Sequence, residues 1–188
     1  MFEQVDLFMS FVFALALTHI LSTATELILA RDRVTVSGPY AIWMFNAVIL
    51  LMTNWLALGN FREVTHWTSG SVMMLFVIAL TLYLICAAMA IKVRENEPVD
   101  MPAFFAANRL VIFGAWAIGR LSVMVANYVF RDLTPVGGAW VKADATLLAG
   151  LAVIAVAAFA KRKWLQWAAA IVYAGMSLVF VANFTLAE

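Results

Sequence analysis

Six long apolar segments, separated by short polar ones, make up this chain. Each is close to the roughly 20 apolar residues needed to cross the hydrocarbon core of a bilayer. The segments cover about 5–30, 39–59, 70–93, 103–130, 138–160 and 164–186. Lipid offers no hydrogen-bond partner to an open strand edge, so such segments must be helical. We therefore predict an all-α, polytopic integral membrane protein with six transmembrane helices in a single domain, residues 1–188.

The composition agrees with this pattern and excludes several kinds of function. Of the 188 residues, 65% are hydrophobic and 12% are charged, against about 45–50% and about 25% in soluble domains. The net charge of +1, without a basic cluster, argues against a nucleic-acid partner. Cys86 is the single cysteine, so no intrachain disulfide and no cysteine-based metal cluster is expected.

No motif of a hydrolase, protease, dinucleotide-binding or nucleotide-binding protein occurs in the chain. His19 and His66 fall at different predicted depths, which argues against a bis-histidine haem site within one subunit. We therefore expect no enzyme activity, no metal and no cofactor. An intramembrane enzyme stays open as an alternative.

Basic residues predict the orientation of the chain, because Lys and Arg gather on the cytoplasmic side of membrane proteins. The connections after the first, third and fifth segments hold Arg31, Arg33, Lys92, Arg94, Lys161, Arg162 and Lys163. The opposite side has Arg62 and Arg131, with Lys142 just inside the fifth segment. Both termini are thus predicted on the non-cytoplasmic side. Short loops and the lack of a eukaryotic-style targeting sequence suggest a bacterial cytoplasmic (inner) membrane. Interfacial positions are predicted for Trp43, Trp67, Trp140 and Trp164.

The first segment contains a polar stretch, LTHILSTATE, within an otherwise apolar run. At about 100° per residue, His19, Ser22, Thr23 and Glu26 share one helical face. Such a stripe must face protein or water, because polar groups turned toward lipid cost several kcal/mol each. Two interpretations are open: the stripe lines a polar interior, or its hydroxyls bond to carbonyls one turn back while Glu26 is hydrated near the interface.

The fourth segment carries two arginines on one helical edge. Arg109 and Arg120 are 11 residues apart, so they lie only about 20° apart around the helix, and Asn127 continues the line. Each guanidinium near the bilayer centre costs at least about 2.5–3.5 kcal/mol before compensation. Both arginines therefore need partners.

Depth along each segment suggests which carboxylates these partners are. Glu26 falls at about the level of Arg109, and Asp144 falls near the level of Arg120. We predict a Glu26–Arg109 contact and an Arg120–Asp144 contact. Such pairs could equally serve only to fix which helix packs against which. The side chains expected to line the space between them are Asn46, Asn54 and Asn127.

Small residues at four-residue spacing predict close helix packing within the bundle or between subunits. A homo-oligomer or other membrane subunits are therefore possible partners, besides the lipid bilayer itself. The spaced pairs are Ala115 with Gly119, Ala145 with Ala149, and Ala170 with Ala174.

One short stretch, Ser10 to Thr18 (SFVFALALT), resembles the first span of small six-span potassium channels related to the lysosomal potassium channel. The chain lacks the Asp-Gly that follows the serine in that family and the Arg that precedes it. The predicted orientation is also reversed, so no function is carried over.

Two functions of different classes fit these observations. The first is a small transporter or channel-like protein for an anionic or carboxylate-bearing solute, because a guanidinium fork suits carboxylate or phosphate. Its ligand-binding or translocation residues would be Arg120, Arg109, Glu26, His19, Asp144, Asn46, Asn54 and Asn127. The alternative is a non-catalytic membrane subunit, scaffold or assembly factor whose buried ion pairs are structural.

Overall fold

The computed structural model describes residues 2–64, 66–130 and 139–182, without the side chains of Asn60, Glu63 and residues 139–144. Six long helices dominate this part of the chain, and they agree closely with the six predicted segments. They are α1 (Phe2–Leu29), α2 (Gly38–Ala57), α3 (Ser69–Ala88), α4 (Met101–Phe130), α5 (Ala139–Phe159) and α6 (Lys163–Ala182). The shorter elements are the 3-10 helices η1 (Arg31–Arg33) and η2 (Leu58–Glu63) and the strands β1 (Val34–Thr35) and β2 (Val99–Asp100).

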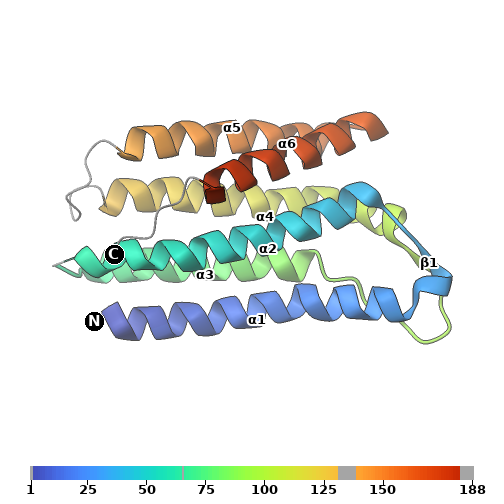
Figure 1. Cartoon of the computed structure of the whole chain (residues 1–188), viewed down its shortest axis with the longest axis horizontal. Helices are drawn as coiled ribbons and strands as arrows, with labels where there is room; N and C mark the ends of the chain where they lie inside the picture. Colours follow the sequence, from blue (N-terminus) through green and yellow to red (C-terminus); the bar gives the residue numbers. More distant parts are fainter. Residues whose placement is uncertain (1, 65, 131–138, 183–188) are drawn as a thin grey trace.

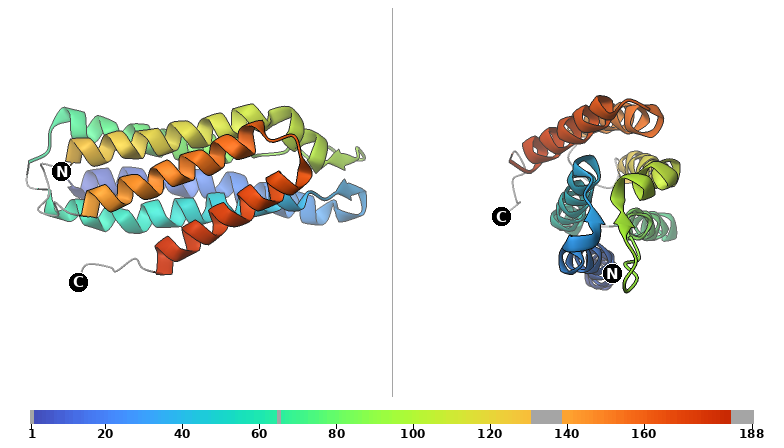
Figure 2. Two further views of the ribbon diagram at one scale, coloured as in Figure 1. Left: turned by 90° about the horizontal axis from the view of Figure 1, so that it is seen from above. Right: turned by 90° about the vertical axis from the view of Figure 1, so that its right-hand side faces the viewer.

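The six helices form two layers of three (Figures 1 and 2). One layer has the order α1, α2, α6 and the other has the order α3, α4, α5. Across the layers, α1 packs on α3 and α5 packs on α6, while α2 faces α4 in the middle. Helix α3 therefore lies between α1 and α4. This order decides which predicted side-chain pairs can form.

Five of the helices are long and apolar enough to cross a membrane, and the apolar part of α5 with described side chains, Ala145–Phe159, is shorter. Large apolar side chains are exposed on the outer surface of the bundle, for example Leu7, Leu29 and Phe159. An all-helical bundle with such a surface is compatible with an integral membrane protein.

Local chemistry explains where several helices begin and end. Asp100 Oδ1 accepts the amide of Ala103 at 2.8 Å at the start of α4, and Thr68 forms a capping box with Ser71 at the start of α3. Helix α3 ends at Ala88, five residues before the predicted limit of 93. Just beyond that end, the carbonyl of Met89 accepts a hydrogen bond from the hydroxyl of Tyr40 on α2.

A short parallel pairing was not predicted. It joins β1 to β2, with Val34 opposite Val99 and Thr35 opposite Asp100. Arg33 reinforces it by donating from Nη1 to the carbonyl of Arg94 at 2.9 Å. Strand β1 lies two residues before α2 and β2 directly precedes α4, so the pairing links the starts of the two central helices.

Trp43 corrects one of the interfacial predictions. It lies near the start of α2, yet its side chain is fully buried among aromatic residues of the core rather than at a surface. Trp164, at the start of α6, is 61% exposed, and Trp67 is half-buried beside Phe130. The side chain of Trp140 lies outside the described residues.

Candidate functional site

Arg120 of α4 is bonded to Tyr173 of α6. Its Nε donates to the Tyr173 hydroxyl at 2.8 Å, and its Nη2 donates to the same oxygen. The guanidinium carbon also lies 5.1 Å from the centre of the tyrosine ring, a cation–π distance. The guanidinium also lies close to Gly150 of α5: a Cβ added to this glycine would lie 3.5 Å from Arg120 Nε. The arginine thus joins three helices at one level.

Two tryptophans enclose the ring of Tyr173. Its centroid lies 5.1 Å from that of Trp43 on α2 and 5.1 Å from that of Trp116 on α4. The two indoles are 5.2 Å apart in an edge-to-face arrangement. All three side chains are fully buried. We call Trp43, Trp116 and Tyr173 the aromatic cluster; it fills the space where α2 faces α4, and such ring pairs add about 0.5–1.5 kcal/mol each beyond area burial.

Three buried polar atoms near this cluster have no hydrogen-bond partner among the described residues. They are Nε1 of Trp43, Nε1 of Trp116 and Oδ1 of Asn46. Asn46 lies one turn after Trp43 and uses its Nδ2 to donate to the Ala170 carbonyl of α6 at 3.2 Å. Two of these three atoms are donors and one is an acceptor.

Arg109, eleven residues earlier on α4, contacts the end of α5 instead. Its Nη1 donates to the Ala160 carbonyl at 2.7 Å. Gln166 of α6 donates from Nε2 to the same carbonyl at 2.7 Å and to that of Ala157 at 2.8 Å. A cation at a helix C-terminus also interacts favourably with the helix dipole. Arg109 and Gln166 therefore cap α5 together.

The predicted Glu26–Arg109 contact was wrong. Glu26 is exposed on α1, where its Oε1 accepts from Ser22 Oγ at 3.3 Å, and α3 separates α1 from α4. No ion pair of Arg109 occurs in the described part of the chain. The contact was predicted from the depth of each residue along its own segment. Depth alone does not show which helices are neighbours.

The Arg120–Asp144 contact stays a prediction. Asp144 belongs to α5, which packs against α4, but its side chain lies outside the described residues.

The polar side chains of the α1 stripe do not all face one interior space. His19 Nε2 is 3.0 Å from the Tyr83 hydroxyl of α3, and the two rings meet edge to face with centroids 5.1 Å apart. Thr23 is buried, whereas Ser22 and Glu26 are exposed. Only part of the stripe therefore faces protein.

The asparagines are also dispersed. Asn54 donates to the Leu50 carbonyl of its own helix at 2.8 Å, and Asn127 is half-buried on α4. Arg120 and Asn46 both reach the same stretch of α6, around Ala170 and Tyr173.

Tyr173 and Gln166 are the partners that sequence reasoning missed. They are seven residues apart on α6, which places them on one helical face. A polar pair at that spacing in an apolar segment was the available signal.

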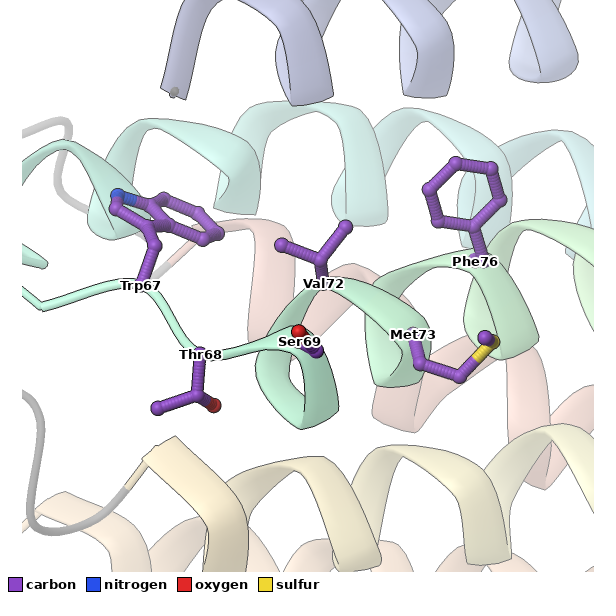
Figure 3. Close-up of a pocket in the computed structure, with 6 residues that line it drawn as sticks. All are labelled: Trp67, Thr68, Ser69, Val72, Met73 and Phe76. Carbon is purple, nitrogen blue, oxygen red and sulfur yellow. The ribbon is translucent and has the colours of Figure 1, made fainter.

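Among the cavities at the surface of the described structure are two that Arg120 does not line. The first, of about 360 Å³, lies at the start of α3 (Figure 3). It is lined by Trp67, Thr68, Ser69, Val72, Met73 and Phe76. The second, of about 430 Å³, lies between α1 and α2 at the end of the bundle that carries β1.

No known family matches this chain. Neither the comparison with protein-family models nor those with curated proteins and solved structures found a match. Within the described residues, no group of three or more His, Cys, Asp or Glu side chains could hold a metal ion.

Proposed function

We propose that this protein is a non-catalytic integral membrane subunit or assembly factor, whose buried polar side chains fix the order of its helices. One observation carries the proposal: three buried or half-buried polar side chains of α2 and α4 bond to groups outside their own helix. Arg120 bonds to Tyr173, and Asn46 bonds to the Ala170 carbonyl. Arg109 bonds to the carbonyl just after α5. Buried polar pairs of this kind can specify one arrangement among several packed alternatives.

The aromatic cluster supports the same proposal. Its three rings occupy the space where α2 faces α4, and they pack edge to face or tilted at centroid distances of 5.1–5.2 Å. A permeation route for a solute would instead need a water-accessible path lined by polar groups.

A second candidate is binding or transport of a small anionic solute at Arg120. The indole N–H groups of Trp43 and Trp116 favour it, since they are two buried donors without a partner among the described residues and both rings pack against Tyr173, the partner of Arg120. A solute that binds the Nε–Nη2 edge of the guanidinium would have to displace the Tyr173 hydroxyl, because that oxygen accepts from both nitrogens.

Reconstitution into liposomes tests both candidates. We would measure flux of chloride, acetate and phosphate with the wild-type protein, Arg120→Gln, and Arg162→Gln as an exposed, charge-matched control. The subunit proposal expects no flux above that of empty liposomes for any of the three proteins, with a loss of thermal stability in Arg120→Gln alone. Saturable flux that is lost in Arg120→Gln and kept in Arg162→Gln would overturn it.

We further propose that the end bearing β1 and β2 faces the cytoplasm of a bacterial cell, with both termini outside. Arg31, Arg33, Lys92 and Arg94 at this end support that orientation through the positive-inside rule. In a Cys86→Ala background, single cysteines at Arg94 and Ser69 should be labelled by an impermeant maleimide from opposite sides of the membrane. Labelling of position 94 in intact cells would reverse the orientation.

A further inference from the structure

The groove between α1 and α2 has an apolar wall and a basic mouth. It is lined by Ile20, Ala24 and Ile28 of α1, by Arg31 just beyond α1, and by Ala41 and Phe45 of α2. All the other described residues that line it are uncharged. The groove opens on the outer surface, where Leu21, Ile28 and Phe45 are more than half exposed.

The length of this groove matches one leaflet of a bilayer. From Arg31 to Ile20 the helix rises about 16 Å at 1.5 Å per residue, and half of the hydrocarbon core is about 15 Å. A transmembrane helix from a partner or a second copy would need a groove that continues across the whole core. This groove instead ends near the middle of α1, as expected for a single acyl chain.

Arg31 is available to an external anion. Its side chain is 76% exposed, and its contact with Asp32, at 3.9 Å from Nε to Oδ1, is a weak surface pair. The neighbouring Arg33 is engaged with the carbonyls of Arg94 and Glu97. A guanidinium at the level of the headgroups binds phosphate through charge-assisted hydrogen bonds.

We propose that this groove binds one acyl chain of an anionic phospholipid, with the lipid phosphate on Arg31. The small side chains of Ala24 and Ala41 leave room for the chain between the two helices. The inference rests on the membrane location proposed above, but not on whether the protein is a subunit or a transporter.

Native mass spectrometry of the protein purified in mild detergent tests this proposal. The protein would be mixed with equal amounts of phosphatidylglycerol and phosphatidylcholine, and the retained lipid would be counted. We expect the wild type to retain one phosphatidylglycerol molecule in preference to phosphatidylcholine. Arg31→Gln should lower that preference about fivefold, the effect of about one basic residue at an anionic surface. Arg162→Gln, at the same end but outside the groove, should leave it unchanged.

Filling the groove gives a second, independent measurement. Ala24→Phe should abolish retention of the lipid, whereas Ala107→Phe, on the exposed face of α4, should not. Phosphatidylglycerol with a photoreactive acyl chain should label residues 20–28 and 41–48 of the wild type.

Three outcomes would overturn the proposal: equal retention of both lipids by the wild type, unchanged preference in Arg31→Gln, or photolabelling confined to other helices. Crosslinking of a second copy through this groove would also overturn it. A protein that purifies without detergent and retains no lipid would instead contradict the membrane location itself.

Discussion

The two arginines of α4 share one helical edge but are held in different ways. Arg109 donates to a backbone carbonyl at the end of α5, and Gln166 donates to the same oxygen. Arg120 donates to a side chain, the Tyr173 hydroxyl, and its guanidinium lies over the tyrosine ring. The first arrangement depends on the position of a helix end, and the second depends on a packed aromatic cluster.

Within the described residues, each guanidinium has a partner that is not a carboxylate: a backbone carbonyl for Arg109 and a phenol hydroxyl for Arg120. A cation at a helix C-terminus gains typically 0.3–1 kcal/mol, and up to about 2 kcal/mol when partly buried. A cation–π contact is worth about 0.5–1 kcal/mol at an exposed site and about 2 kcal/mol or more when desolvated, and Arg120 also donates two hydrogen bonds to the hydroxyl. The region around Arg120 should therefore be more sensitive to substitution than the region around Arg109.

The largest effect is expected for Trp116→Ala. The substitution leaves a cavity beside Tyr173 and should lower the free energy of unfolding by about 3–5 kcal/mol, as for other buried large-to-small changes. Unfolding by SDS titration in bicelles would measure this loss. Trp164→Ala, at a position 61% exposed, is the matched control and should stay within about 0.5 kcal/mol of the wild type. Equal losses in both variants would contradict the central role of the aromatic cluster.

A smaller effect is expected for Tyr173→Phe, which keeps the ring and removes the hydroxyl. The guanidinium of Arg120 then loses its acceptor on α6, and unfolding should become easier by about 1.5–3 kcal/mol. Tyr128→Phe, at a position 78% exposed, should change little. A double-mutant cycle with Arg120→Gln should show coupling above about 0.5 kcal/mol, and additive effects would argue against the contact.

A smaller loss, about 1 kcal/mol in the free energy of unfolding, is expected for Arg109→Gln, because Gln166 still donates to the Ala160 carbonyl. The double variant Arg109→Gln with Gln166→Leu should lose more than the sum of the single variants, since that carbonyl then has neither described donor. Thermal unfolding followed by circular dichroism would show the difference. A loss in Arg109→Gln as large as that in Tyr173→Phe would reverse the proposed order of the two regions.

The smallest effect is expected for Glu26→Gln, within about 0.5 kcal/mol of the wild type. Glu26 is exposed and contacts only Ser22 among the described residues, so neutralising it removes no interhelical contact. The same SDS titration applies. A loss above 2 kcal/mol that disappears in an Arg109→Gln background would restore the ion pair predicted from the sequence.

The positions of the helices could be predicted because long apolar runs and the polar breaks between them are local features of the sequence. The neighbours of each helix could not, since neighbour order depends on how side-chain shapes pack in three dimensions. The position of Arg109 along its segment placed it near one end of the bundle, where it contacts the carbonyl just after α5. That position did not reveal that α3 separates it from Glu26. Trp43 was placed at an interface by its sequence position alone, whereas contacts with Trp116 and Tyr173 bury it.

Asn46 was predicted to line a polar space, and it does approach α6, where its Nδ2 reaches the Ala170 carbonyl. Its partner is a backbone group, which no pattern of side chains reveals. Tyr173 was missed because a single tyrosine in an apolar run is usually interpreted as packing. Its seven-residue spacing from Gln166 was the better guide.

The pairing of β1 with β2 makes this protein sensitive to the length of a very short connection. Two residues, Val36 and Ser37, separate β1 from α2. A single residue inserted there, with β1 still paired, would turn the whole of α2 by about 100° and shift it by about 1.5 Å. Trp43 and Asn46 would then point away from α6, so relatives of this chain should tolerate changes of residue type between Thr35 and Gly38 far better than changes in the number of residues.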